Sequence, residues 1–163
     1  MRIEDFKIQW FPGHMTKAKR MMESQIKLVD VVVEMLDARI PRSSTNPMLI
    51  DVLGNKPKVI ALNKTDMADN AKTELWMQKL KNSGLPVCKV DCATGKGVKQ
   101  LISMIQVAAK PVLDKWLKKG VRNRSVRVMI VGIPNVGKST LINRLVGKNK
   151  VVVKAVHNVS FDV

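Results

Sequence analysis

Short runs of apolar, often β-branched residues alternate along the chain with segments in which apolar positions recur at helical spacing. The apolar runs predict four strands, at residues 31–36, 58–63, 85–91 and 126–132. Helices are predicted at residues 16–28, 46–53, 69–84, 97–119 (with an interruption at Pro111) and 138–146. Because each strand is apolar almost throughout, both of its faces should be covered, which is typical of a parallel sheet between two helical layers. The pattern therefore predicts an α/β fold of three layers.

Composition narrows the class of protein. The chain has 163 residues, 45% of them hydrophobic and 26% charged, which suits one globular domain. Lys and Arg number 29 against 13 Asp and Glu, a net charge of +16, so a polyanionic partner such as nucleic acid, ribonucleoprotein or an acidic membrane surface is expected. No apolar run reaches the roughly 18 residues of a membrane span, and no signal peptide is evident, so we expect a soluble intracellular protein. Two cysteines, Cys88 and Cys92, are expected to be free thiols.

A phosphate-binding sequence follows the last predicted strand. Residues 132–139 read GIPNVGKS and match the pattern G-x-x-x-x-G-K-S at a strand-to-helix junction. In such a loop the backbone N–H groups and the helix N-terminus bind phosphate oxygens, the lysine reaches the β- and γ-phosphates, and the serine hydroxyl binds Mg²⁺. A purely structural glycine turn is the alternative. The predicted phosphate-binding residues are Asn135, Val136, Gly137, Lys138, Ser139 and Thr140, with Ser139 as the magnesium ligand and Lys138 also as a catalytic residue.

A second motif points to the base. Asn63, Lys64, Thr65 and Asp66 follow the strand at 58–63. A carboxylate at Asp66 can accept from N1–H and the exocyclic amine of guanine, whereas adenine offers no such pair of donors, so a buried Asp66 would reject adenine. Asn63 would brace the loops, and Asp91 and Cys92 begin a turn whose backbone N–H groups could meet the guanine O6. Taken alone, this motif could be a polar turn, and an ATP-using phosphate-loop enzyme is a further alternative that Asp66 disfavours.

The order of these motifs is permuted, since the base motif precedes the phosphate loop. This order, with IQWFPGHM at residues 8–15 and DARIP at 37–41 followed by Ser43, Ser44, Asn46 and Pro47, resembles the bacterial ribosome biogenesis GTPase A family of circularly permuted GTPases. The resemblance runs from about Ile8 to Leu145. It implies a circularly permuted, Ras-like P-loop GTPase fold, and a cytoplasmic, monomeric protein. It also implies binding of GTP or GDP with Mg²⁺, and action on the large-subunit precursor through its rRNA and proteins.

The resemblance also suggests two further residues and a division of the chain. His14 becomes a candidate for positioning the attacking water, although a loop histidine that helps to dock the N-terminus or RNA is equally consistent. Asn135 is placed like an asparagine that coordinates K⁺ in some GTPases, although it could simply fill the loop. Residues 1–29 would form a basic N-terminal segment and helix, and 30–163 the G domain. Between Lys115 and Lys154 there are 11 Lys or Arg and no Asp or Glu, which favours contact with rRNA phosphates.

The switch motifs of a working GTPase are not found after the phosphate loop. The one D-x-x-G sequence, at residues 51–54, reads as a helix end closed by Gly54. We therefore expect a truncated G domain with an incomplete sheet, in which the strand at 126–131 is an edge unless residues 151–156 pair with it. Guanine-nucleotide binding with little or no hydrolysis is predicted. A non-enzymatic rRNA-binding module with a vestigial nucleotide site remains the alternative.

Overall fold

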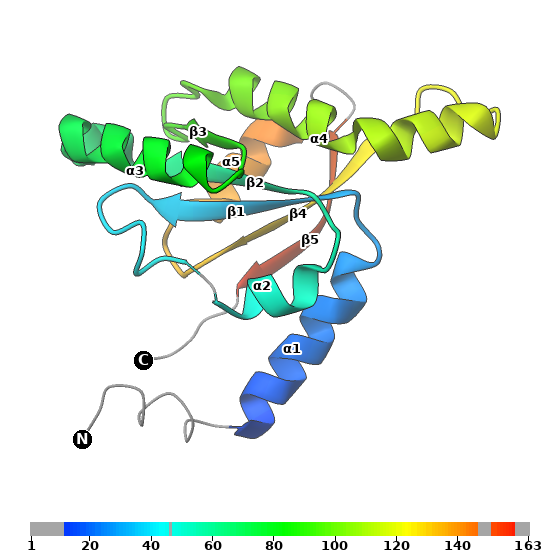
Figure 1. Cartoon of the computed structure of the whole chain (residues 1–163), viewed down its shortest axis with the longest axis horizontal. Coiled ribbons are helices and arrows are strands. Elements are labelled where there is room, and N and C mark those ends of the chain that lie inside the picture. Colours follow the sequence, from blue (N-terminus) through cyan, green and yellow to red (C-terminus); the bar gives the residue numbers. More distant parts are fainter. Residues whose placement is uncertain (1–11, 46, 147–150, 159–163) are drawn as a thin grey trace.

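The computed structural model describes the backbone of residues 12–45, 47–146 and 151–158, and within these it leaves the side chains of 12–16, 18, 48 and 151–158 undescribed. Helices and strands alternate through most of this part of the chain (Figure 1). In chain order they are α1 (Pro12–Ile26), β1 (Val31–Asp37), α2 (Pro47–Leu53), β2 (Lys58–Asn63), the 3₁₀ turn η2 (Thr65–Met67), α3 (Asn70–Asn82), β3 (Val87–Lys89), α4 (Val98–Lys118), β4 (Val126–Gly132), α5 (Lys138–Leu145) and β5 (Val151–Asn158).

The sheet has five strands in the order β3-β2-β1-β4-β5, and every neighbouring pair is parallel. The predicted parallel α/β sheet is thus confirmed. Of the two possibilities left open for β4, the structure has the second: residues 151–158 form β5 and pair with β4 from Val126 opposite Val151 to Gly132 opposite Asn158, so β4 is not an edge strand. The backbone groups of β4 that an edge would leave unpaired are bonded to β5 instead.

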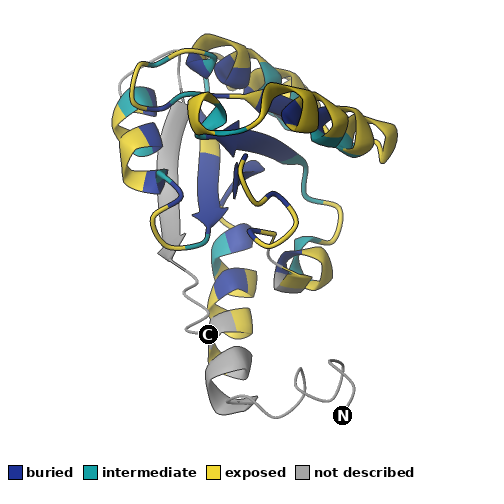
Figure 2. Cartoon of the chain, turned by 90° about the vertical axis from the view of Figure 1, so that its left-hand side faces the viewer, coloured by how far each residue is buried: buried dark blue, intermediate teal, exposed yellow. Residues whose placement is uncertain are grey.

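Helices cover both faces of this sheet. On one face α4 and α5 pack over Val31, Val33 and Met35 and their neighbours, and on the other α1 and α2 pack over Val32 and α3 over Leu36. Figure 2 shows the strands whose burial is described as a largely buried layer between more exposed helices. Alternate residues of β1 therefore point into different helical layers, which is why all seven of its residues are buried.

Three predicted boundaries differ from the structure. The first helix begins at Pro12, so Pro12 to Met15 are helical rather than loop. The third strand is only Val87–Lys89. The fourth helix runs without interruption through Pro111, which is exposed, so that water can replace the hydrogen bond that proline cannot donate. Gly54, with φ +57°, follows the end of α2, as its reading as a helix terminus predicted.

Candidate functional site

The predicted phosphate and base loops meet at one edge of the sheet. Because all strands are parallel, the segments after β1, β2, β3 and β4 leave the sheet at its carboxyl ends, where ligands of open α/β folds bind. The 63–66, 91–94 and 132–139 segments are therefore neighbours in space, although the first and last lie about seventy residues apart in sequence. Side-chain hydrogen bonds of Asn63 and Lys64 join these segments.

The loop between β4 and α5 has the conformation of a phosphate cradle. Asn135 and Gly137 have positive φ angles of 61° and 108°, so the backbone turns tightly before α5 begins at Lys138. The first turn of α5 contains no acidic residue, so its N-terminal partial positive charge is not offset there. Ser139 and Thr140 follow on the exposed side of this turn. The donor set is thus suited to phosphate oxygens, with the Ser139 hydroxyl available to a magnesium ion bound beside them.

Lys138 lies beneath this loop. Its ammonium group donates to the carbonyl oxygens of Gly132, at 2.6 Å, and Ile133, at 2.9 Å. The residue is buried, with 5% of its surface exposed, and burial lowers the pKa of its ammonium group. No described carboxylate forms an ion pair with this cation, which is held by two neutral carbonyls, so an anionic phosphate would be its charge complement.

Asn63 connects three loops. Its side-chain amide donates to the Val136 carbonyl oxygen at 2.8 Å, and its oxygen accepts from the Cys92 backbone N–H at 3.1 Å. The phosphate loop comes so close that a Cβ atom on Gly137 would lie 2.4 Å from the Asn63 amide nitrogen. Glycine is therefore required at this position by proximity as well as by its φ angle. The buried Asn63 side chain holds the phosphate loop and the 91–94 turn at the end of β2.

Lys64 makes a second connection from the base motif to the phosphate loop. Its ammonium group donates to the Asn135 carbonyl oxygen at 2.7 Å and lies 3.8 Å from the Asp37 carboxylate. Asp37, buried at the end of β1, also accepts from the Arg39 backbone N–H and from two guanidinium nitrogens of Arg39, at 2.8–3.0 Å. The Arg39 hydrogen bonds hold the pKa of Asp37 below its usual range. Sequence analysis used residues 37–41 only for the family resemblance and assigned Asp37 and Arg39 no role at the site.

The remaining predicted base-binding residues, Thr65, Asp66 and Asp91, are exposed or partly exposed. Asp66 is exposed in the turn η2, beside the partly exposed Thr65, so it is not the buried group that the sequence suggested. Asp91 accepts from the backbone N–H groups of Ala93 and Thr94, at 3.1 and 3.3 Å, and so shapes its own turn. Arg144 of α5 donates to the carbonyl oxygens of Cys92 and Ala93, at 3.1 and 2.5 Å. Sequence reasoning missed this arginine, which had looked like one member of a basic run.

Other predicted features are less fully described. His14 lies in the first turn of α1, but its side chain is outside the described residues. Cys88 and Cys92 are free and buried, as expected for two thiols.

Among the side chains that the structure describes, no group of three or more His, Cys, Asp or Glu could hold a metal ion by itself. Within the described ranges, no helix is long and apolar enough to span a bilayer.

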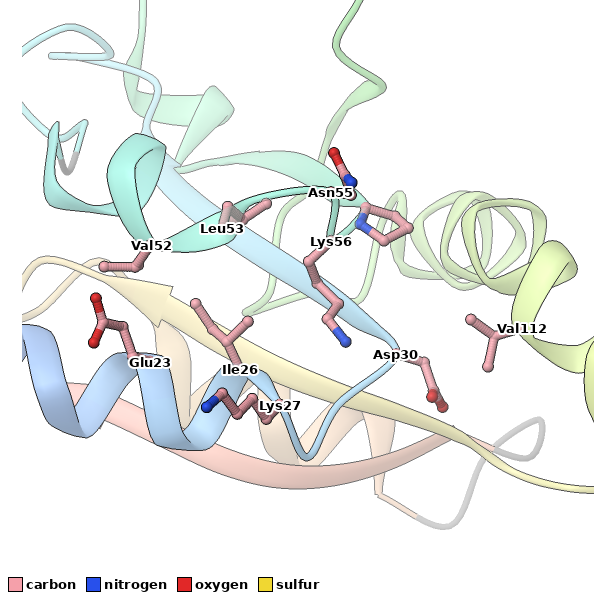
Figure 3. A pocket seen from close by; sticks show the side chains of 10 residues that line it. Glu23, Ile26, Lys27, Asp30, Val52, Leu53, Asn55, Lys56 and Val112 are labelled. Atoms are coloured by element: carbon pink, nitrogen blue, oxygen red, sulfur yellow. The ribbon is translucent and has the colours of Figure 1, made fainter.

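A cavity of about 500 Å³ lies at the opposite end of the strands (Figure 3). Asp30, which precedes β1, and Lys56 and Pro57, which precede β2, line it together with side chains of α1, α2 and α4. Its position at the amino ends of the strands separates it from the phosphate loop, so it is not part of the candidate nucleotide site.

Comparisons with known proteins agree with the motifs. A family model described as 50S ribosome-binding GTPase matches residues 127–162. The chain is 50% identical over 142 residues to ribosome biogenesis GTPase A of Bacillus licheniformis, covering 87% of this chain and 50% of that protein. It is 38% identical over 138 residues to mitochondrial ribosome-associated GTPase 1 of Mus musculus, covering 84% and 41% respectively.

The fold also matches a solved structure. GNP-bound YlqF from T. maritima superposes with a TM-score of 0.60 at 34% identity, over 82% of this chain and 49% of that one. The chain thus spans about half the length of the curated relatives that it matches.

Proposed function

Since the chain belongs to the ribosome biogenesis GTPase A family of circularly permuted GTPases, we propose that it binds GTP and GDP and acts in assembly of the large ribosomal subunit. Its partners in this role would be the rRNA and proteins of the subunit precursor. The chain would act in the cytoplasm as a monomer. The names of two relatives, ribosome biogenesis GTPase A and mitochondrial ribosome-associated GTPase 1, support this assignment.

The observation that carries the nucleotide proposal is the pair of hydrogen bonds made by Asn63. They join the base motif, the 91–94 turn and the phosphate loop at one edge of the sheet. Asp66 would then receive the two guanine donors, and Lys138 would lie under the β- and γ-phosphates. Burial of the Lys138 ammonium group, which donates to two neutral carbonyl oxygens, supports this role, because a phosphate would supply the complementary negative charge.

Mg²⁺ would be held by the Ser139 hydroxyl together with phosphate oxygens and would neutralise their charge. Two finer assignments stay proposals on the family resemblance: Asn135 as a K⁺ ligand and His14 as the residue that positions water. If Asn135 binds K⁺, replacing K⁺ by Na⁺ in the buffer should weaken nucleotide binding or turnover in the parent chain. The same replacement should have little effect in Asn135→Ala.

Fluorescent GDP and ADP analogues, titrated into the 163-residue chain with Mg²⁺, test the proposal. We expect tighter binding of the guanine analogue, at least a tenfold loss with Lys138→Ala, and no change with Lys99→Ala, an exposed lysine of α4. Asp66→Asn should remove the preference for guanine, whereas Asp114→Asn, also exposed, should keep it. Equal affinity for the two analogues would refute guanine recognition, and binding that survives Lys138→Ala would refute the phosphate assignment.

A non-enzymatic rRNA-binding module is the second candidate, and the net charge of +16 favours it. In that case RNA affinity should fall steeply with salt but should not respond to GTP, GDP or Lys138→Ala. Measuring RNA affinity with and without each nucleotide therefore separates the two functions.

A further inference from the structure

The structure divides the basic run of residues 115–154 among different places. Lys138 is buried under the phosphate loop, and Arg144 holds the 91–94 turn through carbonyl oxygens. Lys148, Lys150 and Lys154 lie outside the described side chains. Arg127 is exposed within β4, and the other members are in the last two turns of α4 and in the segment that leads to β4. The run is therefore not one continuous face, and among its described side chains the exposed cations gather mainly in this last group.

The second half of α4 lies beyond the core. All five buried residues of this helix fall between Val98 and Ala109, and none of its residues after Ala109 is buried. Figure 1 shows this part of α4 continuing past the sheet before the chain turns back into β4. In this part of the helix Leu117 is 53% exposed, and Leu113 packs against the core while only partly buried. Because the extension adds little to the core, much of its surface is free to contact a partner.

Contacts of Arg124 with Trp116 and Asp30 hold the end of this extension in place. The Arg124 guanidinium lies 4.9 Å from the centroid of the Trp116 ring, and the Lys119 ammonium lies 5.3 Å from it. Arg124 also donates to both carboxylate oxygens of Asp30, at 2.8 and 3.1 Å. Asp30 is 6% exposed, lines the cavity in Figure 3 and accepts from the Arg127 backbone N–H as well. Arg124 thus ties the α4 extension to the residue before β1, through its cation–π contact with Trp116 and its part-buried ion pair with Asp30.

Four cations at this end remain exposed. Lys115, Lys118, Lys119 and Arg122 form what we call the α4 basic surface. Among the residues that the structure describes, no carboxylate lies within ion-pair distance of any of them, whereas Arg124 is already matched by Asp30. Asp114 is the nearest acidic residue in sequence, and it too is exposed.

We propose that the α4 basic surface binds the phosphate backbone of RNA, at a place separate from the nucleotide site. This inference rests on the proposed role in ribosome assembly, which supplies RNA as the polyanion. Four cations within eight residues of a helix and its end match closely spaced phosphates better than the scattered carboxylates of a protein surface. Trp116 is engaged with the protein's own cations, so contact through phosphates rather than base stacking is expected, with little dependence on RNA sequence.

The test uses a labelled RNA duplex of arbitrary sequence and the full 163-residue chain, with affinity measured at several salt concentrations. The test variant is Lys115→Gln, Lys118→Gln, Lys119→Gln, Arg122→Gln. The control variant is Lys72→Gln, Lys79→Gln, Lys81→Gln, Lys99→Gln, which removes four exposed cations from α3 and the start of α4. We expect the test variant to lose at least tenfold in affinity near 0.1 M salt, and its slope of log affinity against log salt to become shallower by about 3 to 4. The control should change by less than threefold.

An equal loss in both variants would overturn the proposal, because total charge rather than this surface would then govern binding. Unchanged RNA affinity in the test variant would also overturn it. So would binding of this surface to anionic phospholipid vesicles with no binding to the duplex, which would assign it to a membrane. Fluorescent GDP affinity, measured in the same samples, distinguishes this proposal from the previous one. If the test variant binds GDP normally but has lost RNA affinity, the RNA-binding role of the α4 basic surface is supported independently of the nucleotide site. If the parent chain does not bind GDP, the proposed nucleotide site is refuted, and the proposal for the α4 basic surface is still tested by RNA affinity.

Discussion

Replacing Asn63 by alanine tests most directly how the site is held together. The substitution removes the donor to the Val136 carbonyl oxygen and the acceptor for the Cys92 backbone N–H. Val136 and Cys92 are each only 1% exposed, so water cannot easily replace the lost side chain. Both backbone groups should therefore be left buried and unpaired.

The size of the effect follows from these two groups. A buried polar group left without its partner costs about 1–3 kcal/mol, so the loss of both bonds should lower the free energy of unfolding by about 2–6 kcal/mol. With a urea dependence of about 2 kcal/mol per molar for a domain of this size, the midpoint should fall by about 1–3 M. Because small domains have total stabilities of about 5–15 kcal/mol, a loss near the middle of this range leaves the variant folded in buffer.

Urea unfolding followed by far-UV circular dichroism measures this change. Asn82→Ala is the matched control, since Asn82 is exposed at the end of α3 and its side-chain oxygen accepts a hydrogen bond from the exposed Gln78, at 3.0 Å. The control should change stability by less than about 0.5 kcal/mol. The affinity for fluorescent GDP should fall in Asn63→Ala and stay unchanged in Asn82→Ala. An Asn63→Ala midpoint within error of the control would refute the claim that Asn63 holds the three loops.

Three further predictions address neighbouring groups. Gly137→Ala should lower stability by about 1–3 kcal/mol and abolish GDP binding in the titration above, because φ of 108° is strained for alanine and its Cβ would lie 2.4 Å from the Asn63 amide nitrogen. Asp37, whose pKa is held below 3.8 by hydrogen bonds from Arg39, contributes stability that is present above pH 3.8 and lost as the pH falls through the lowered pKa. Asp37→Asn should therefore lose more stability at pH 6 than at pH 3 in urea titrations, and an equal loss at both would contradict this. Burial raises the pKa of the Cys88 thiol to about 12, so it should react with a thiol reagent at pH 8 far more slowly in the native protein than in urea; similar rates in both states would show that the thiol is accessible.

The sequence alone determined the features that depend on local chemistry. The phosphate loop was predictable because two glycines, a lysine and a serine at fixed spacing specify a tight turn before a helix, and Asn135 and Gly137 do have the positive φ angles of such a turn. The strands β1, β2 and β4 were predictable because continuous apolar runs require burial on both faces. The permuted order of the motifs also follows from sequence, since it concerns only their positions along the chain.

Tertiary structure decided the features that depend on partners distant in sequence. The hydrogen bond from Asn63 to Val136 spans 73 residues, and those from Arg144 to the 91–94 turn span about 50, so neither could be derived from local patterns. Hydropathy alone did not show whether residues 151–158 pair with β4. Strand pairing is made by backbone N–H and C=O groups, which nearly all residues have, so the side-chain pattern does not reveal it. The basic run looks uniform along the chain. In the folded protein, however, Lys138 is buried under the phosphate loop and Arg144 donates to the 91–94 turn. Among the members of the run whose side chains the structure describes, those at the end of α4 lie together on the surface, because that part of the helix extends beyond the core.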